Sequence, residues 1–122
     1  MSYRYNLVKS YLHKIKLSQE IKNYYKNRIV LVTGGAGAIG SNLAIALSIL
    51  VGKNGMVIVL DNLSAIKGSN PIDMPELPNL MFIKGDITND IDLKRVFRER
   101  PTIVFHLAAF FANQNSVDYP EY

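Results

Sequence analysis

Four glycines follow a run of aliphatic residues early in the chain, in the segment "LVTGGAGAIGSN" at residues 31–42. Three of them, Gly34, Gly37 and Gly40, have the spacing G-x-x-G-x-x-G where a predicted strand turns into a predicted helix. Without a Cβ, the first permits a tight turn, the second lets the backbone approach a diphosphate, and the third lets the helix pack closely on the strand. Unpaired N–H groups at the helix N-terminus favour phosphate. The pattern predicts a dinucleotide site, although such a turn can also be purely structural.

An acidic residue follows at the distance that such a site requires. Asp61 ends the next apolar run, 21 residues after Gly40. A carboxylate there accepts hydrogen bonds from both hydroxyls of an adenosine ribose and repels a 2′-phosphate, which favours NAD over NADP. No arginine follows directly, and the next cation along the chain is Lys67. The alternative is that Asp61 and Asn62 only begin a turn.

Short apolar runs alternate with amphipathic segments in the body of the chain, and this order predicts an α/β fold. One predicted helix begins at Ala38 and ends in a Gly-Lys-Asn-Gly cluster; the other is opened by Asp90 and stops before Pro101. Three prolines predict a loop over 65–79. Right-handed crossovers then favour a Rossmann-type doubly wound parallel sheet with strand order 3-2-1-4. The predicted strands are 28–33, 56–61, 80–86 and 102–109.

The positive charge of the chain is concentrated at its beginning. Residues 1–28 hold seven Lys or Arg and one Glu, a formal charge of +6, whereas the whole chain carries +4. Leu7, Tyr11 and Ile15 recur at helical spacing, and Ser18 is placed to cap a second short helix. We therefore predict a basic helical extension over 1–27 and a dinucleotide-binding domain over 28–122. The extension either packs its apolar face on the domain or on a neighbouring chain, which is the simpler expectation, or docks on an anionic membrane or RNA.

Composition excludes several classes of site and partner. The chain of 122 residues has no cysteine, so disulfides, thiolate metal sites and cysteine nucleophiles are ruled out, and two histidines far apart predict no metal site. No apolar run is long enough to span a bilayer, and the first residues lack the apolar centre of a secretory signal. We expect a cytoplasmic protein without a membrane span. Nucleic acid is not an expected partner, because the body of the chain carries a charge of −2.

Four segments in order, "VTGGAGAIGSNL", "VLDNLS", "KGDITND" and "VFHLAA", resemble the N-terminal half of extended short-chain dehydrogenases/reductases, in particular the NAD-dependent nucleotide-sugar epimerases and dehydratases. The resemblance runs from residue 29 to 122. It implies NAD as the cofactor and assigns a contact to each matching position. The implied positions are Gly34, Gly37, Ala38 and Ile39 at the pyrophosphate, Asp61 and Asn62 at the ribose, Asp86 and Ile87 at the adenine, and Leu107, Ala108 and Ala109 on the nicotinamide side.

Some of these positions have simpler readings. Asp86 follows a predicted strand and a glycine, so it could equally begin a turn. His106 ends an apolar run, where a lone histidine is expected to be hydrogen-bonded in the core and not catalytic. Ala38 stands where family members commonly carry an aromatic residue, which removes packing but no polar contact.

The catalytic groups that the resemblance implies have no counterpart here. Family members use a Ser or Thr and the tyrosine of a Y-x-x-x-K helix, which would be expected beyond Tyr122. The match at Tyr5 and Lys9 precedes the first strand and is interpreted as a helical i, i+4 pair. No catalytic residue is predicted. Two functions stay open: the NAD-binding part of a nucleotide-sugar epimerase or dehydratase, homodimeric when complete and acting by transient hydride transfer, or a non-catalytic dinucleotide-binding or regulatory module.

Overall fold

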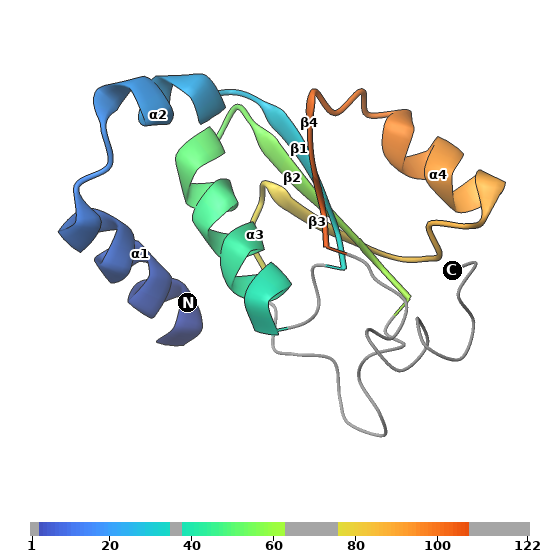
Figure 1. Ribbon diagram of the computed structural model, residues 1–122, viewed down its shortest axis with the longest axis horizontal. Helices are drawn as coiled ribbons and strands as arrows, with labels where there is room; N and C mark the ends of the chain where they lie inside the picture. Colours follow the sequence, from blue (N-terminus) through green and yellow to red (C-terminus); the bar gives the residue numbers. More distant parts are fainter. Residues whose placement is uncertain (1–2, 35–37, 63–75, 108–122) are drawn as a thin grey trace, which may run out of the picture.

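The computed structural model describes residues 3–34, 38–62 and 76–107 (Figure 1). Its centre is a parallel sheet of four strands in the order β3-β2-β1-β4. The predicted α/β class and strand order are confirmed. The strands are β1 (Ile29–Thr33), β2 (Met56–Asp61), β3 (Leu80–Lys84) and β4 (Ile103–His106).

Two strands are shorter than predicted. β3 ends at Lys84, because the chain turns after Gly85 toward the next helix, and β4 covers only 103–106 of the expected 102–109. Residues 108 and 109 lie outside the described part of the chain. The central strands β1 and β2 carry four consecutive buried residues each, as expected for strands covered on both faces.

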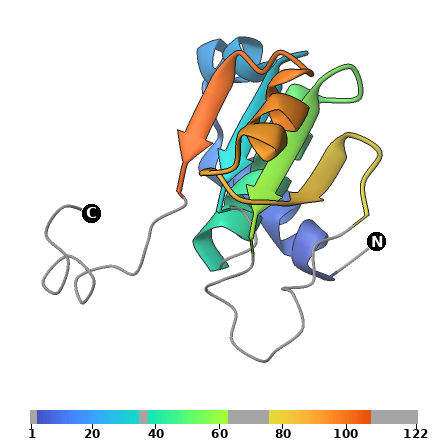
Figure 2. The ribbon, with the colours of Figure 1, turned by 90° about the vertical axis from the view of Figure 1, so that its right-hand side faces the viewer.

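One helix covers each face of the sheet. α3 (Ala38–Val51) lies on one face and α4 (Asp90–Phe97) on the other, as Figure 1 shows, and Figure 2 looks onto the face that carries α4. Under α3, Val30, Val32, Val57 and Val59 form one cluster of buried side chains with Leu47 and its neighbours. Under α4, the buried cluster contains Leu31, Ile58, Leu60, Ile83 and Val96. The alternation along each strand thus sends successive side chains into two separate cores.

A third layer lies outside α3. α1 (Tyr3–Ile15) and α2 (Gln19–Tyr25) both contact α3, and Figure 1 shows α1 on the side of α3 away from the sheet. α3 carries no charged residue, which fits a helix enclosed between a sheet and other helices. Its first turn is the exception, because Ile39 is 80% exposed at the carboxyl edge of the sheet.

The predicted starts of α2 and α4 are confirmed. The Ser18 hydroxyl accepts a hydrogen bond from the Ile21 N–H at 3.2 Å and caps α2, as predicted. α4 is capped by Asn89 and not by Asp90. The Asn89 side chain accepts from the N–H groups of Ile91 and Asp92 while its own backbone is extended. Asp90 is the first helical residue, where its charge favours the positive end of the helix.

Candidate functional site

The turn after β1 bends the chain sharply at the carboxyl edge of the sheet. Gly34 has a φ of 76°, a left-handed conformation that costs glycine little, and its N–H donates to the Leu60 carbonyl at 2.8 Å. α3 begins four residues later at Ala38. The N-terminus of α3, the exposed Ile39 and the buried Gly40 therefore lie beside the end of β1. The middle glycine of the pattern, Gly37, is outside the described residues.

Asp61 lies one strand away from this turn. It is the last residue of β2, half-buried, and the exposed Asn62 follows it. Because Leu60 is in register with Thr33, Asp61 is next to the Gly34 turn. On the other side Asp61 is in register with the exposed Lys84 of β3, so this lysine is on the same face and at the same strand end. The sequence alone pointed to Lys67, which lies outside the described residues, and missed Lys84.

Asp86 stands in the loop after β3 and makes a tight local turn. Its Oδ1 accepts hydrogen bonds from the Thr88 N–H at 2.8 Å and from the Thr88 hydroxyl at 2.7 Å. These bonds, the backbone one first, lower the pKa of Asp86 below its usual range. Asp86 therefore begins a turn, which was the alternative interpretation of its position after a strand and a glycine. Within the described part of the chain, no hydrogen bond reaches its Oδ2, which remains an acceptor for a ligand. Ile87 packs against the core under α4.

Asp92 fixes the position of this loop, a role that no pattern in the sequence predicts. Its Oδ2 accepts a hydrogen bond from the Asp86 N–H at 2.9 Å. A Cβ on Gly85 would lie 2.8 Å from Asp92 Cγ and 2.9 Å from Leu60 Cδ1, so a larger residue here would have to displace the Asp92 carboxylate or Leu60. The one available signal was an acidic residue in the first turn of α4, which is typical of helix starts in general. Asp92 positions the loop through its hydrogen bond with the Asp86 N–H.

β4 lies on the other side of β1, at the end of the row of strands that forms this edge. Thr33 Oγ1 and His106 Nδ1 are hydrogen-bonded at 2.7 Å, and the Leu107 N–H donates to the Thr33 carbonyl at 2.9 Å. His106 is hydrogen-bonded as expected, but it is exposed and not in the core, because α4 does not cover the end of this outer strand. Leu107 is 40% exposed. Ala108 and Ala109 lie outside the described residues.

Most of the predicted contact residues therefore meet along one edge of the sheet, in the spatial order Asp86, Asp61, Gly34 and Leu107 across β3, β2, β1 and β4. Tyr5 and Lys9 lie on α1, which packs against α3. Residues 3–34, 38–62 and 76–107 contain no group of three His, Asp or Glu side chains that could hold a metal ion, and none of their helices is long and apolar enough to cross a bilayer.

A parallel sheet with a glycine turn after its first strand and an acidic residue at the end of its second is typical of the Rossmann-type dinucleotide-binding class. The family model that matches residues 30–122 is described as the NAD dependent epimerase/dehydratase family. The chain belongs to this family. The expected family and its cofactor, NAD, are thereby confirmed at the level of the family.

Individual relatives agree with this assignment. A dTDP-D-glucose 4,6-dehydratase from Dictyostelium discoideum is 43% identical over 90 residues, which are 71% of this chain and 20% of that protein. An epimerase from Methanothermobacter thermautotrophicus matches with 54% identity and a TM-score of 0.69, over 84% of this chain and 29% of that one. WbmF of Bordetella bronchiseptica in complex with NAD+ matches with 37% identity and a TM-score of 0.62, over 80% and 28% of the two chains. The chain spans 20% to 28% of the length of the first curated relatives it matches.

Proposed function

We propose that the carboxyl edge of the sheet binds NAD, with the diphosphate at the Gly34–Gly40 turn and the N-terminus of α3. Asp61 and Asn62 take the ribose of the adenosine, Asp86 and Ile87 lie at the adenine, and Leu107, Ala108 and Ala109 border the nicotinamide side. The groups fit the ligand: a left-handed glycine and a helix N-terminus suit phosphates, and carboxylates suit hydroxyl and amino donors.

The observation that carries this proposal is the placement of Asp61. Its strand is hydrogen-bonded to β1, and the Gly34 N–H bonds to the Leu60 carbonyl directly before it. A ligand with phosphates at the turn would therefore meet a carboxylate at the adjacent strand end, and a ribose diol is the part of NAD that such a carboxylate binds. The complexes of WbmF with NAD+, and with NAD+ and UDP, support the proposal.

For the whole protein we propose a nucleotide-sugar epimerase or dehydratase, cytoplasmic and homodimeric, with residues 28–122 as part of its dinucleotide-binding domain and 1–27 as a helical extension. NAD, when bound, supplies the acceptor for a hydride removed transiently from the sugar. The residues described here bind and orient the cofactor. A second reading, a module that binds the dinucleotide without catalysis, makes the same prediction for binding.

Calorimetric titration with NAD and NADP tests the site. Replacing Asp61→Ala removes charge-assisted hydrogen bonds to the ribose, and we expect NAD binding to weaken by about 1.5–3 kcal/mol, roughly tenfold to a hundredfold. The preference for NAD over NADP should shrink as well, because the repulsion of a 2′-phosphate is lost. Glu20→Gln is the matched control: this acid lies on α2, which leads into the amino end of β1, and its loss should leave both affinities unchanged.

Unchanged NAD affinity in Asp61→Ala, with the fold intact by circular dichroism, would overturn the placement of the ribose. Binding of NADP as tight as that of NAD by the unaltered chain would show that Lys84, and not Asp61, dominates this strand end.

A further inference from the structure

The two helices of the extension and the end of α3 line a hollow of about 710 Å³. α1 and α2 each pack on α3, and Figure 1 shows α2 beside the C-terminal end of that helix. Small-molecule sites in proteins typically have volumes of about 300–1,000 Å³. The hollow is therefore large enough for a ligand of that size.

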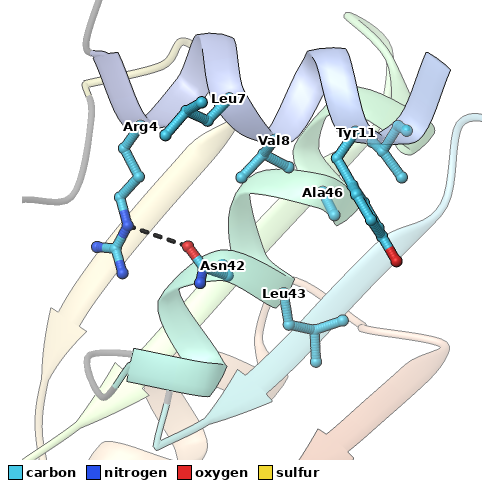
Figure 3. A pocket seen from close by; sticks show the side chains of 8 residues that line it. Arg4, Leu7, Val8, Tyr11, Asn42, Leu43 and Ala46 are labelled. Atoms are coloured by element: carbon cyan, nitrogen blue, oxygen red, sulfur yellow. Dashed lines mark hydrogen bonds between the residues drawn. The ribbon is translucent and has the colours of Figure 1, made fainter. Parts of the chain in front are cut away.

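The packing of α1 on α3 determines which flank of α1 borders the hollow. In Figure 3, Val8 of α1 extends toward α3. At the beginning of α1, Arg4 Nε donates a hydrogen bond to Asn42 Oδ1 of α3 at 3.0 Å. With α1 held in this way, Lys9 and His13, one turn apart on the same flank, line the hollow.

α2 presents polar side chains to the same hollow. Gln19, Lys22 and Asn23 of α2, and Lys26 directly after it, are spaced three or four residues apart and so share one side of the helix. Gln19 Nε2 donates to Asn23 Oδ1 at 2.9 Å, which orders these two amides at the hollow. Cations from two separate helices therefore converge on one place.

The positive charge in the hollow has no counter-charge among the described residues. Three lysines, Lys9, Lys22 and Lys26, line the hollow, and no acidic residue does. Glu20 is the only acid in 3–34, and it is not one of the lining residues. Within the described ranges none of the three lysines takes part in an ion pair. Like charges that share a hollow repel one another, and a bound anion would offset this repulsion.

The backbone at the end of α3 is also compatible with an anion. The last carbonyls of a helix carry a partial negative charge, which opposes anion binding. Here Asn79 Nδ2 donates to the carbonyls of Ser48 and Gly52 at 2.8 and 2.9 Å, and the Asn27 N–H donates to the Val51 carbonyl at 2.9 Å. These donors reduce the repulsion that the helix end would exert on an anion in the hollow.

We propose that this hollow binds an organic polyphosphate, a small molecule that joins two or three phosphates to an apolar or aromatic group. The phosphates lie on the three lysines, because ammonium groups bind phosphate as point charges. The organic part lies on half-buried aliphatic side chains that complete the lining: Leu12, Leu17, Ile49 and Leu50.

This site is separate from the proposed NAD site. α3 has 14 residues, and a helix of this length extends about 20 Å. The proposed dinucleotide site lies at its N-terminus, whereas the hollow lies at its C-terminal end. In addition, α1 and α2 precede residue 30, where the match to the family model begins. The site therefore belongs to the helical extension, and its occupation does not depend on the proposed function.

Calorimetric titration of the full chain with GTP, a probe that joins three phosphates to a ring system, tests the proposal. Saturating NAD is present, so that binding at the carboxyl edge is not measured. In the triple variant Lys9→Gln, Lys22→Gln, Lys26→Gln, GTP affinity should fall about 100-fold, since each exposed ion pair contributes up to about a factor of five. A control triple loses the same charge outside the hollow and should bind GTP like the unaltered protein: Lys14→Gln, Lys16→Gln, Lys94→Gln.

A second pair of variants tests the organic part of the ligand. Leu17→Ala should weaken GTP binding about fivefold, because less apolar surface is covered, and should leave the binding of inorganic tripolyphosphate unchanged. Leu7→Ala, on α1 but outside the lining of the hollow, should change neither affinity. Circular dichroism establishes that each variant is folded.

Backbone amide NMR locates the bound probe. GTP should shift the signals of Ser10, Asn23 and Gly52 at the hollow and should leave those of Gly34 and Ile39 unchanged. Shift changes at Gly34 and Ile39 alone would overturn the proposal, because GTP would then occupy the dinucleotide site.

The remaining outcomes also decide between ligands. Absence of GTP binding, or equal GTP affinity in the two lysine triples, would contradict the proposal. Tripolyphosphate that binds as tightly as GTP, together with no effect of Leu17→Ala, would overturn it in favour of an inorganic polyanion. Single-stranded RNA that binds more tightly than GTP and is weakened equally by both lysine triples would show a diffuse basic surface instead of a site.

Discussion

Asp86 is a residue whose charge the local structure holds in place. Two donors of Thr88 converge on one of its oxygens, and the resulting depression of its pKa keeps the carboxylate ionised. An ionised carboxylate accepts hydrogen bonds and donates none. Oδ2, which receives no hydrogen bond from the described residues, could therefore accept one from the amino group of the proposed adenine. Because the Thr88 donors stabilise only the ionised carboxylate, the stability of this loop depends on pH.

Asp86 makes the fold more acid-sensitive. A carboxylate whose pKa is lower in the folded than in the unfolded chain adds stability above the unfolded pKa, and this stability is lost as the pH falls through the folded pKa. Replacing Asp86→Asn should therefore lower the melting temperature near neutral pH and should have less effect in acid. Thermal unfolding measured across the acidic range checks this. Thr88→Val, which removes only the hydroxyl donor, should raise the pKa of Asp86 toward its usual range in a carboxyl NMR titration, and an unshifted titration would contradict the account.

Residue spacing predicted some of the site and not the rest. Gly34 and Asp61 were identified because a tight turn and a strand end impose a residue type at a fixed separation. Lys84 was missed because its register partner, Asp61, lies on another strand. Asp92 was missed because its hydrogen bond to the Asp86 N–H, six residues earlier, depends on how the loop between them folds. No local pattern encodes such contacts.

At the scale of elements, α4 and the loop after β3 form one unit. Asn89 caps the helix, and Asp92 from its first turn returns to the Asp86 N–H. Arg95 lies 3.7 Å from the other oxygen of Asp92 and is half exposed. The position of the loop at the carboxyl edge therefore depends on the helix behind it.

Asp92→Ala should lower the free energy of unfolding by about 1–3 kcal/mol, because the half-buried N–H of Asp86 loses its acceptor. Denaturant titration measures this loss. Arg95→Ala is the control, and we expect less than about 1 kcal/mol from it, as for a solvent-exposed ion pair. Equal losses in the two variants would show that the ion pair, and not the loop hydrogen bond, is what Asp92 provides.

Element types and their order were predictable, whereas some of their ends were not. Short apolar runs, helical periodicity and glycine or proline boundaries identified all four strands and the two helices that cover the sheet. β3 ends at Lys84, and the chain leaves the sheet after Gly85, whose N–H still donates to the Asp61 carbonyl. The end of β3 is therefore decided by the last hydrogen bond to a distant strand, whereas α4 begins at Asp90 as predicted, with Asn89 as its cap. The exposure of Leu7, Tyr11 and Ile15 on α1 was not predicted either, since helical periodicity shows an apolar face but not how much of it the domain covers.

At the scale of the whole molecule, the described sheet has two outer strands that expose apolar side chains. Val104 of β4 is 49% exposed, and Met81 and Phe82 of β3 are 36% and 40% exposed. An outer strand with free backbone groups and an apolar surface pairs readily with other strands. We therefore expect this chain to self-associate in solution.

Sedimentation velocity over a range of concentrations tests this expectation. Val104→Lys should reduce association, because a charge on an outer strand opposes pairing, and Ile91→Lys on α4 should leave association unchanged. A monomer at every concentration would contradict the expectation.

The central claim is that the carboxyl edge of the sheet binds NAD, and backbone amide NMR during a titration with NAD tests it most directly. If NAD binds there, the largest changes in amide chemical shift should fall on residues at this edge: Gly34, Ile39, Asp61, Asp86 and Leu107. Arg28 and Lys53, near the amino ends of β1 and β2, should change little. Largest changes at the amino ends, or none at saturating NAD, would contradict it.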